Sequence, residues 1–273
     1  MHRTFFLTLV VLLAACAQSV AQTPIVAPSP KASPMETPTA ISTLVVPSAT
    51  VIPTLTVTPS CVPLKIMPLG DSITYGEGIV GYGGYRNLLG ALLESDGIQF
   101  DFVGSQTSGE GALTDTDNEG HPGWRISNLR EAIAAEGWLE TYQPDIILLH
   151  IGSNDLMQVD PNNQRYVNLA AVSVNLSVLL DDILARLPGT HVIVAQIIRT
   201  RWGSDVNHLY YNEAVPEIAA SKEGRVSVVD MQDILSKGDF VTLYHPSPRG
   251  YDKIAHAWRT AILALNLGKC ASP

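Results

Sequence analysis

Five short apolar runs stand out between residues 64 and 229. They span Leu64–Leu69, Phe100–Val103, Asp145–Ile151, His191–Ile197 and Val226–Val229. Each has the length of a strand, and three are apolar almost without a break, which is typical of parallel strands buried on both faces of a sheet. The pattern therefore predicts five strands in a mostly parallel sheet.

Amphipathic stretches with helical spacing separate or follow these runs. They cover about Gly84–Glu94, Ile126–Glu136, Tyr166–Leu187, Asn207–Ala220 and Gly250–Leu265. Strands that alternate with helices indicate an α/β fold, here a three-layer α/β/α sandwich around the five-stranded sheet. Ligands of such sheets bind at the carboxyl ends of the strands, so functional residues are expected directly after each run.

Composition and charge narrow the classes of function. The 273 residues are 46% hydrophobic and 16% charged, enough apolar material for a full core. With 17 basic and 26 acidic residues the net charge is −9, the wrong sign for a protein that binds the phosphate backbone of nucleic acids. We therefore expect no nucleic-acid partner. The three cysteines form no CxxC pair of the kind that zinc knuckles and redox motifs use.

The first 60 residues have the pattern of an exported, tethered protein. In residues 1–21 an apolar run, Phe5–Ala15, follows a basic residue, which is typical of an export signal and too short to span a bilayer. The segment Leu13–Cys16 resembles the lipobox of bacterial lipoproteins, which implies lipid attachment at Cys16; a plain secretory signal cut after Ala21 is the alternative. Residues 22–60 contain eight Pro, eight Thr and five Ser, a composition that favours an extended linker. We expect a secreted protein held at the cell surface on this stalk.

Residues 61–273 remain for the folded domain, and two cysteines bracket them. Cys61 is its first residue, and Cys270 lies close to its end. In an exported protein such a pair favours a disulfide, with two unrelated thiols as the alternative.

Polar residues that follow the predicted strands are of the types that a catalytic site needs. Ser72 follows the first run, Gly104 the second and Asn154 the third, and His245 precedes the last helix. Each alone is more often a cap, turn or structural residue. Together they supply a hydroxyl nucleophile, a base, and donors for a developing oxyanion, all at one edge of the sheet.

These residues resemble the SGNH (GDSL-type) hydrolase superfamily, whose name gives the four residue types in chain order. The resemblance covers nearly all of residues 64–265. Within it, six segments are similar to carbohydrate esterase family three, the acetylxylan esterases: Ile66–Gly76, Gly84–Arg86, Asp101–Ser105, Glu119–Trp124, His150–Asp155 and His245–Ser247. The Gly-x-Ser-x-Gly string of α/β-hydrolases does not occur.

The resemblance implies a flavodoxin-like SGNH fold and a role for each site residue. Ser72 is the implied nucleophile, and His245 the general base and later acid. The backbone N–H groups of Ser72 and Gly104 and the side chain of Asn154 form the implied oxyanion hole.

The position three residues before the histidine departs from the family pattern. The family usually has an aspartate there, and this chain has Thr242. Thr242 is a candidate third member of the site, because it can accept a hydrogen bond from the imidazole and fix its tautomer, but it cannot offset the imidazolium charge. In a serine protease, replacing the triad aspartate by asparagine lowers kcat about 10⁴-fold. We expect a Ser72–His245 dyad, with a backbone carbonyl or Asp239 as alternative orienters.

Two further pairs of residues have both a structural and a functional interpretation. Asp71 and Asp155 are expected to support their turns through hydrogen bonds rather than to act in catalysis. His121 and Trp124 are substrate-binding candidates, because an aromatic face stacks on a sugar ring; packing of their loop is the alternative.

The acidic residues Asp115, Asp117 and Glu119 are close enough in sequence to bind calcium. The ordinary interpretation is a solvated acidic loop, and we expect no metal.

The implied function is removal of acetyl groups from a plant polysaccharide such as xylan, through an acetyl-enzyme on Ser72. We expect a monomeric serine esterase that needs no cofactor and contacts a membrane only through the lipid at Cys16. Its partner is an acetylated polysaccharide or a small ester. A lipase, thioesterase or other deacetylase on the same fold is one alternative. A carbohydrate-binding module with negligible turnover is another, because the usual aspartate is missing.

Overall fold

A seven-stranded sheet forms the centre of the computed structural model, which describes residues 62–157, 168–203 and 206–266. The strands are β1 (Leu64–Gly70), β2 (Phe100–Phe102), β3 (Gln106–Thr107), β4 (Asp117–Gly120), β5 (Ile146–His150), β6 (His191–Gln196) and β7 (Val226–Asp230). Their order is β3-β4-β1-β5-β6-β7, and β2 pairs with the first half of β1. The pairs are parallel except for β3 with β4, so the sheet is mostly parallel as predicted.

The predicted number of strands, five, is wrong. The five predicted strands are present, but β3 and β4 extend the sheet beyond them. Strand β4 pairs with the end of β1, where Leu69 lies opposite Glu119 and Gly70 opposite Gly120. Its sequence, Asp-Asn-Glu-Gly, has no apolar residue, so a hydrophobic pattern cannot predict it.

Eight α-helices and one 3₁₀ turn occur in the described residues. They are α1 (Ser72–Tyr75), α2 (Arg86–Ser95), α3 (Ile126–Glu136), α4 (Trp138–Tyr142), α5 (Ser153–Leu156), α6 (Leu169–Arg186), α7 (Val206–Ala220), η1 (Lys237–Asp239) and α8 (Pro248–Ala264). The five long helices match the predicted stretches to within three residues at each end. The short ones are too brief to show a helical period.

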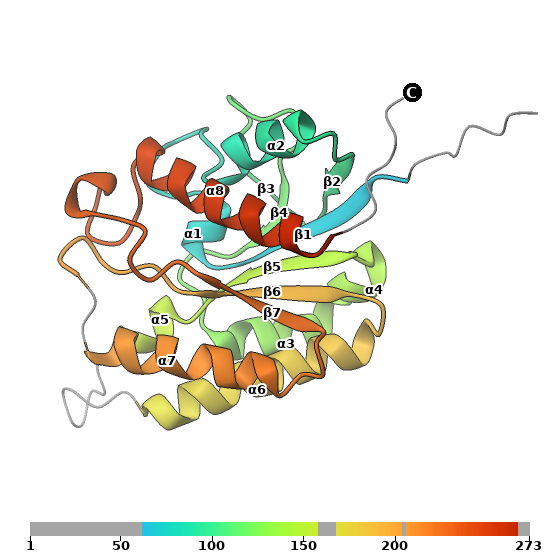
Figure 1. The fold of residues 1–273 in the computed structure, drawn as a ribbon, viewed down its shortest axis with the longest axis vertical. Helices are drawn as coiled ribbons and strands as arrows, with labels where there is room; N and C mark the ends of the chain where they lie inside the picture. Colours follow the sequence, from blue (N-terminus) through green and yellow to red (C-terminus); the bar gives the residue numbers. More distant parts are fainter. Residues whose placement is uncertain (1–61, 158–167, 204–205, 267–273) are drawn as a thin grey trace, which may run out of the picture. The chain divides into compact units, whose positions relative to one another are not determined.

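The helices form a layer on each face of the sheet. Helices α2 and α8 cover one face, and α3, α6 and α7 cover the other (Figure 1). Successive residues of the central strands point into opposite layers: Ile66 and Leu148 pack with α2 and α8, whereas Met67 and Leu149 pack with the other layer. All four are fully buried, which explains the unbroken apolar runs. The α/β/α sandwich is confirmed.

Several predictions fall outside the described residues. Lipid attachment at Cys16 and the Cys61–Cys270 disulfide are among them, as are the segments 1–21 and 22–60. None of the helices that the structure describes has the length and apolar character needed to cross a membrane.

Candidate active site

The turn after β1 presents Ser72 at the start of helix α1. Gly70 ends the strand, and a Cβ there would lie 2.1 Å from the carbonyl oxygen of His150 on β5, so only glycine fits. Asp71 caps the helix, because its Oδ1 accepts a hydrogen bond from the N–H of Ile73 at 3.0 Å. The supporting role predicted for Asp71 is confirmed. Ser72 thus lies at the carboxyl end of a central strand, where such sheets bind ligands.

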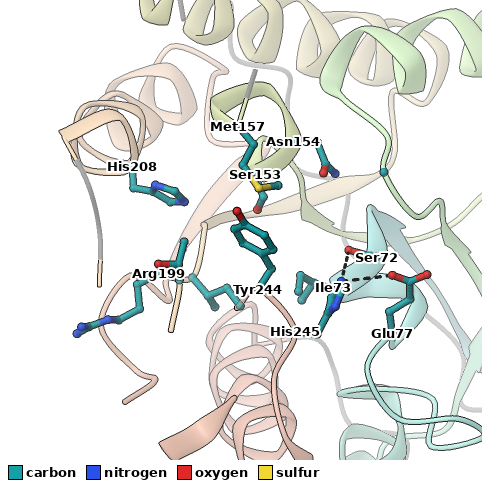
Figure 2. Close-up of a pocket in the computed structure, with 13 residues that line it drawn as sticks. Ser72, Ile73, Glu77, Ser153, Asn154, Met157, Arg199, His208, Tyr244 and His245 are labelled. Atoms are coloured by element: carbon teal, nitrogen blue, oxygen red, sulfur yellow. Dashed lines mark hydrogen bonds and ion pairs between the residues drawn. The ribbon is translucent and has the colours of Figure 1, made fainter. Parts of the chain in front are cut away.

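His245 reaches this serine from the loop before α8. Its Nε2 lies 3.1 Å from Ser72 Oγ, within hydrogen-bond distance (Figure 2). The carbonyl of His245 accepts a hydrogen bond from Val241 N, and Ser247 caps α8 through a bond from Gly250 N to its Oγ. These bonds fix the loop, so the structure brings together the two residues that the sequence paired as nucleophile and base.

The other ring nitrogen of His245 faces Thr242. Thr242 Oγ1 lies 3.2 Å from Nδ1, so the predicted contact is present. The same oxygen accepts hydrogen bonds from the backbone N–H groups of Tyr244 at 3.2 Å and His245 at 2.9 Å. The imidazole therefore has a neutral hydroxyl where a charged carboxylate would complete a triad.

Asp239, the alternative orienter, is engaged elsewhere. Its buried carboxylate accepts hydrogen bonds from the backbone and hydroxyl of Ser236, from Arg249 and from Lys253, each 2.7 Å long. Burial disfavours its charge, but these donors hold the pKa of Asp239 well below its usual range. These contacts give no support to Asp239 as the alternative orienter of His245, because this carboxylate joins η1 to α8.

Glu77 is a site residue that the sequence pattern did not reveal. Its Oε2 lies 3.3 Å from His245 Nε2, so the carboxylate and Ser72 share one ring nitrogen (Figure 2). The available signal was a carboxylate between two glycines, Gly76 and Gly78, just after the nucleophile turn.

The two predicted oxyanion donors besides Ser72 have different surroundings. Asn154, in α5, lines the same pocket as Ser72, and its Nδ2 donates a 2.9 Å hydrogen bond to the carbonyl of Trp124. Gly104 follows β2, and a Cβ there would lie 2.1 Å from the carbonyl oxygen of Asn118, so its backbone packs directly on β4. Gly104 is not part of the pocket wall, and its role stays a prediction.

Glu119 anchors the loop that follows Gly104. Its buried carboxylate accepts hydrogen bonds from the backbone and hydroxyl of Ser105, both 2.7 Å, and lies 2.7 Å from His121 Nε2. The expected solvated acidic loop is wrong for this residue, because Glu119 is fully buried in β4. Asp115 is also engaged, accepting a bond from Phe102 N at 2.7 Å. No cluster of His, Cys, Asp or Glu within the described ranges could hold a metal.

His121 and Trp124 form a stack of aromatic rings. The ring of His121 lies 3.9 Å from that of Trp124 and 5.0 Å from that of Trp138, centre to centre, and is nearly parallel to both. His121 is buried and held by Glu119, as loop packing requires, and sugar binding by His121 and Trp124 stays a prediction. Trp124 is partly buried and packs against the core.

Two acidic side chains are buried beside the nucleophile turn. Asp155 has a supporting role, but it supports the start of α3 rather than its own turn as predicted, because it accepts a hydrogen bond from Ile126 N at 3.1 Å. Burial raises the pKa of Asp71 to about 7, with a further contribution from the charge of Asp155. Burial likewise raises the pKa of Asp155 to about 6.

The Ser72–His245 pair opens into a pocket of about 190 Å³. Its wall is formed by Ser72, Ile73, Glu77, Gly123, Ser153, Asn154, Met157, Ile198, Arg199, Thr200, His208, Tyr244 and His245. The side chain of Tyr244 points toward Ser153 and Met157 (Figure 2). Tyr244 and Met157 were not predicted as site residues, because their proximity arises from contact between distant loops.

The sequence matches the GDSL-like Lipase/Acylhydrolase family over residues 69–253, a range that contains both Ser72 and His245. The chain belongs to this family. The superfamily resemblance seen in the motifs is thereby confirmed for this GDSL family member.

Relatives of this GDSL chain include a curated protein and several solved structures. The "Multidomain esterase" of Ruminococcus flavefaciens is 29% identical over 225 residues, which cover 71% of this chain and 28% of the relative. A family 3 carbohydrate esterase of Clostridium thermocellum has a TM-score of 0.65 at 36% identity, covering 76% of this chain and 100% of that one. A carbohydrate esterase family 3 structure from Talaromyces cellulolyticus gives 0.57 at 27% identity, covering 74% and 97%.

These comparisons agree with the similarity to carbohydrate esterase family three that the motifs indicated. The chain spans little more than a quarter of the length of the Ruminococcus relative, so that protein's overall activity is not carried over as a whole.

Proposed function

We propose that this GDSL family member is a serine esterase that removes small acyl groups, in the first place acetyl, from a plant polysaccharide such as xylan. The observation that carries the proposal is the 3.1 Å contact between Ser72 Oγ and His245 Nε2 at the wall of a pocket. A hydroxyl is a weak nucleophile at neutral pH, and a base at this distance can take its proton as it attacks.

In the acylation step, Ser72 Oγ bonds to the ester carbonyl carbon while its proton passes to His245 Nε2. The carbonyl π electrons move onto oxygen, giving a tetrahedral oxyanion. When the oxyanion collapses, the bond to the sugar oxygen breaks, and that oxygen takes the proton from Nε2. The products are an acetyl-serine and a free sugar hydroxyl. Water then repeats the sequence, with His245 as base, and releases acetate.

The oxyanion needs fixed donors. The bond from Asn154 Nδ2 to the carbonyl of Trp124 uses one of the two amide hydrogens and orients the carboxamide. The second hydrogen and the backbone N–H groups of Ser72 and Gly104 are the proposed donors. One such donor is worth about 10²–10³ in kcat in a serine protease.

Pocket size and composition support a short acyl group. The cavity of about 190 Å³ is smaller than the roughly 300–1,000 Å³ typical of sites for drug-sized ligands. Its wall includes polar and charged side chains, among them Glu77, Ser153 and Arg199, which suit a sugar better than a long alkyl chain. The names of the solved relatives, family 3 carbohydrate esterases, support an acylated carbohydrate.

Acetate release from acetylated xylan by the full chain tests the proposal. We expect release by the wild type and a loss of at least about 10³-fold in Ser72→Ala, because the nucleophile is gone. Ser95→Ala, which removes an exposed hydroxyl at the end of α2, is the matched control and should release acetate at the wild-type rate.

Other outcomes separate the alternatives. Xylan binding without Ser72-dependent release would identify a carbohydrate-binding module. A preference for p-nitrophenyl esters of long acyl chains over the acetate would identify a lipase or thioesterase.

We also propose that the enzyme is a cell-surface lipoprotein, attached through Cys16 and separated from the membrane by the Pro- and Thr-rich residues 22–60. The lipobox-like segment Leu13–Cys16 supports this. In a bacterial host the wild type should fractionate with membranes, and Cys16→Ser should not. Membrane association that survives Cys16→Ser would overturn the lipid anchor.

A further inference from the structure

During catalysis by the dyad, His245 carries a positive charge that no triad aspartate offsets. As the proton of Ser72 moves to His245, the imidazole becomes an imidazolium, and a triad aspartate would face that charge at Nδ1. Here Thr242 occupies that edge with a neutral hydroxyl, and Asp239 is bound to Ser236, Arg249 and Lys253. That His245 becomes charged at all rests on the proposed serine mechanism.

The pocket wall contains one candidate for the group that offsets the charge of His245. Of the described residues that line it, Glu77 is the one that carries a carboxylate. Its Oε2 lies 3.3 Å from His245 Nε2, closer than the 3.8 Å that separates the cation of Arg199 from its partner Asp233. A charge pair at this distance is attractive even in a partly solvated setting.

The backbone around Glu77 is built to hold it there. Gly76 and Gly78 both adopt positive φ angles, 92° and 102°, which other residues rarely adopt. A Cβ at Gly78 would lie 2.9 Å from His245 Cβ, so glycine lets this segment approach the imidazole. The N–H of Glu77 donates to the carbonyl of Ser72 at 3.0 Å, and its carbonyl accepts a 2.6 Å bond from the hydroxyl of Tyr251, a buried residue of α8.

We infer that Glu77 is a positioning residue that supplies the counter-charge for the His245 imidazolium, from the Nε2 edge of the ring, in place of the aspartate missing at the Nδ1 edge. The carboxylate attracts the positive ring that forms as Oγ bonds to the acyl carbon. It does not take the proton, which passes from Nε2 to the departing sugar oxygen. The side chain is 41% exposed, so its packing contributes little and its charge is the feature to test.

A double-mutant cycle between positions 77 and 242 tests this inference with p-nitrophenyl acetate and the full chain. Glu77→Gln keeps the size of the side chain and removes its charge. In the wild-type background we expect kcat to fall about tenfold, the size of one partly screened charge interaction, with KM changed by less than about twofold. In a Thr242→Asp background, where a carboxylate faces Nδ1, the same substitution should lower kcat less than about threefold.

Glu131→Gln, the same chemical change at an exposed position of α3, is the control and should leave kcat unchanged in both backgrounds. A purely structural role for Glu77 would lower kcat equally in both backgrounds and would overturn the inference. An unchanged kcat in Glu77→Gln would do the same. A rise in kcat would also overturn it, because it would mean that the carboxylate holds the proton on Nε2 of the resting ring.

Failure of the proposed function has a different signature. If wild-type hydrolysis of p-nitrophenyl acetate does not depend on Ser72, the serine mechanism falls and the role of Glu77 falls with it. If hydrolysis depends on Ser72 and Glu77→Gln matches the wild type, only the role of Glu77 falls.

Discussion

More hydrogen-bond donors lie near Thr242 Oγ1 than its lone pairs can accept. Two backbone N–H groups already point at it, at 2.9 and 3.2 Å, and a hydroxyl oxygen has two lone pairs. A third bond from His245 Nδ1–H has to compete with them. The hydroxyl can instead donate its own proton to Nδ1, which puts the ring proton on Nε2, the edge that must stay free to act as a base. Thr242 therefore fixes the position of the ring better than its tautomer.

Replacing this hydroxyl by a carboxylate should make the imidazole a better base. We expect Thr242→Asp to raise kcat on p-nitrophenyl acetate by at least about tenfold, because a carboxylate accepts from Nδ1–H, cannot donate, and offsets the imidazolium charge. Thr242→Asn, similar in shape but uncharged, is the matched control and should gain much less. An unchanged rate in Thr242→Asp would mean that another group already orients His245, and would contradict the dyad.

The elements show why the sequence predicts the fold well in some places and poorly in others. Helix α6 carries six buried apolar residues at helical spacing, which leaves a helical period. Every residue of β5 is buried, which leaves a nearly unbroken apolar run. Strand β4 leaves none, because its buried residues are polar and are stabilised by hydrogen bonds instead. Asn118 donates to the carbonyls of Gln106 and Thr116, and Glu119 accepts from Ser105. Polar burial of this kind depends on partners that only the fold brings close.

Some residues of the candidate site can be predicted from the sequence, and others cannot, for the same reason. Ser72 and Asn154 follow strands that the hydrophobic pattern predicts, so the sheet topology alone places them at one edge. His245 precedes a predicted helix, and its His-Pro-Ser motif indicates its role. Glu77 and Tyr244 enter the site through contacts between loops far apart in the chain, and such contacts have no periodic signature. The hydrogen bonds of Asp239 to Ser236, Arg249 and Lys253 likewise depend on the fold and have no periodic signature.

For the molecule as a whole, the nucleophile turn carries a cost in stability that depends on pH. Asp71 is fully buried, and its Oδ2 has no hydrogen-bond partner among the described residues. Burial raises its pKa from 3.8 to about 7. Between these two pH values the folded state binds a proton that the unfolded chain releases. Stability therefore falls as pH rises from about 4 to 7 and stays at the lower level above that.

His150 contributes with the opposite sign at acid pH. Burial lowers its pKa to about 4, so the folded state resists a proton that the unfolded chain accepts below 6.5. The stability that neutral His150 contributes is lost as pH falls from about 6.5 toward 4. Any variant that keeps His150 has the same loss.

Asp71→Asn should remove the loss on the alkaline side. Asparagine keeps the oxygen that accepts from Ile73 N, and it cannot ionise. The free energy of unfolding should therefore fall less between pH 5 and pH 8 in Asp71→Asn than in the wild type, by roughly a few kcal/mol. Urea unfolding at pH 5 and pH 8 measures this fall for each protein, and the contribution of His150 cancels when the two proteins are compared. Glu94→Gln, at an exposed position of α2, should keep the wild-type dependence. Equal pH dependence in the wild type and Asp71→Asn would mean that Asp71 is already ionised in the folded state at pH 5, and that the turn holding Ser72 tolerates a buried charge.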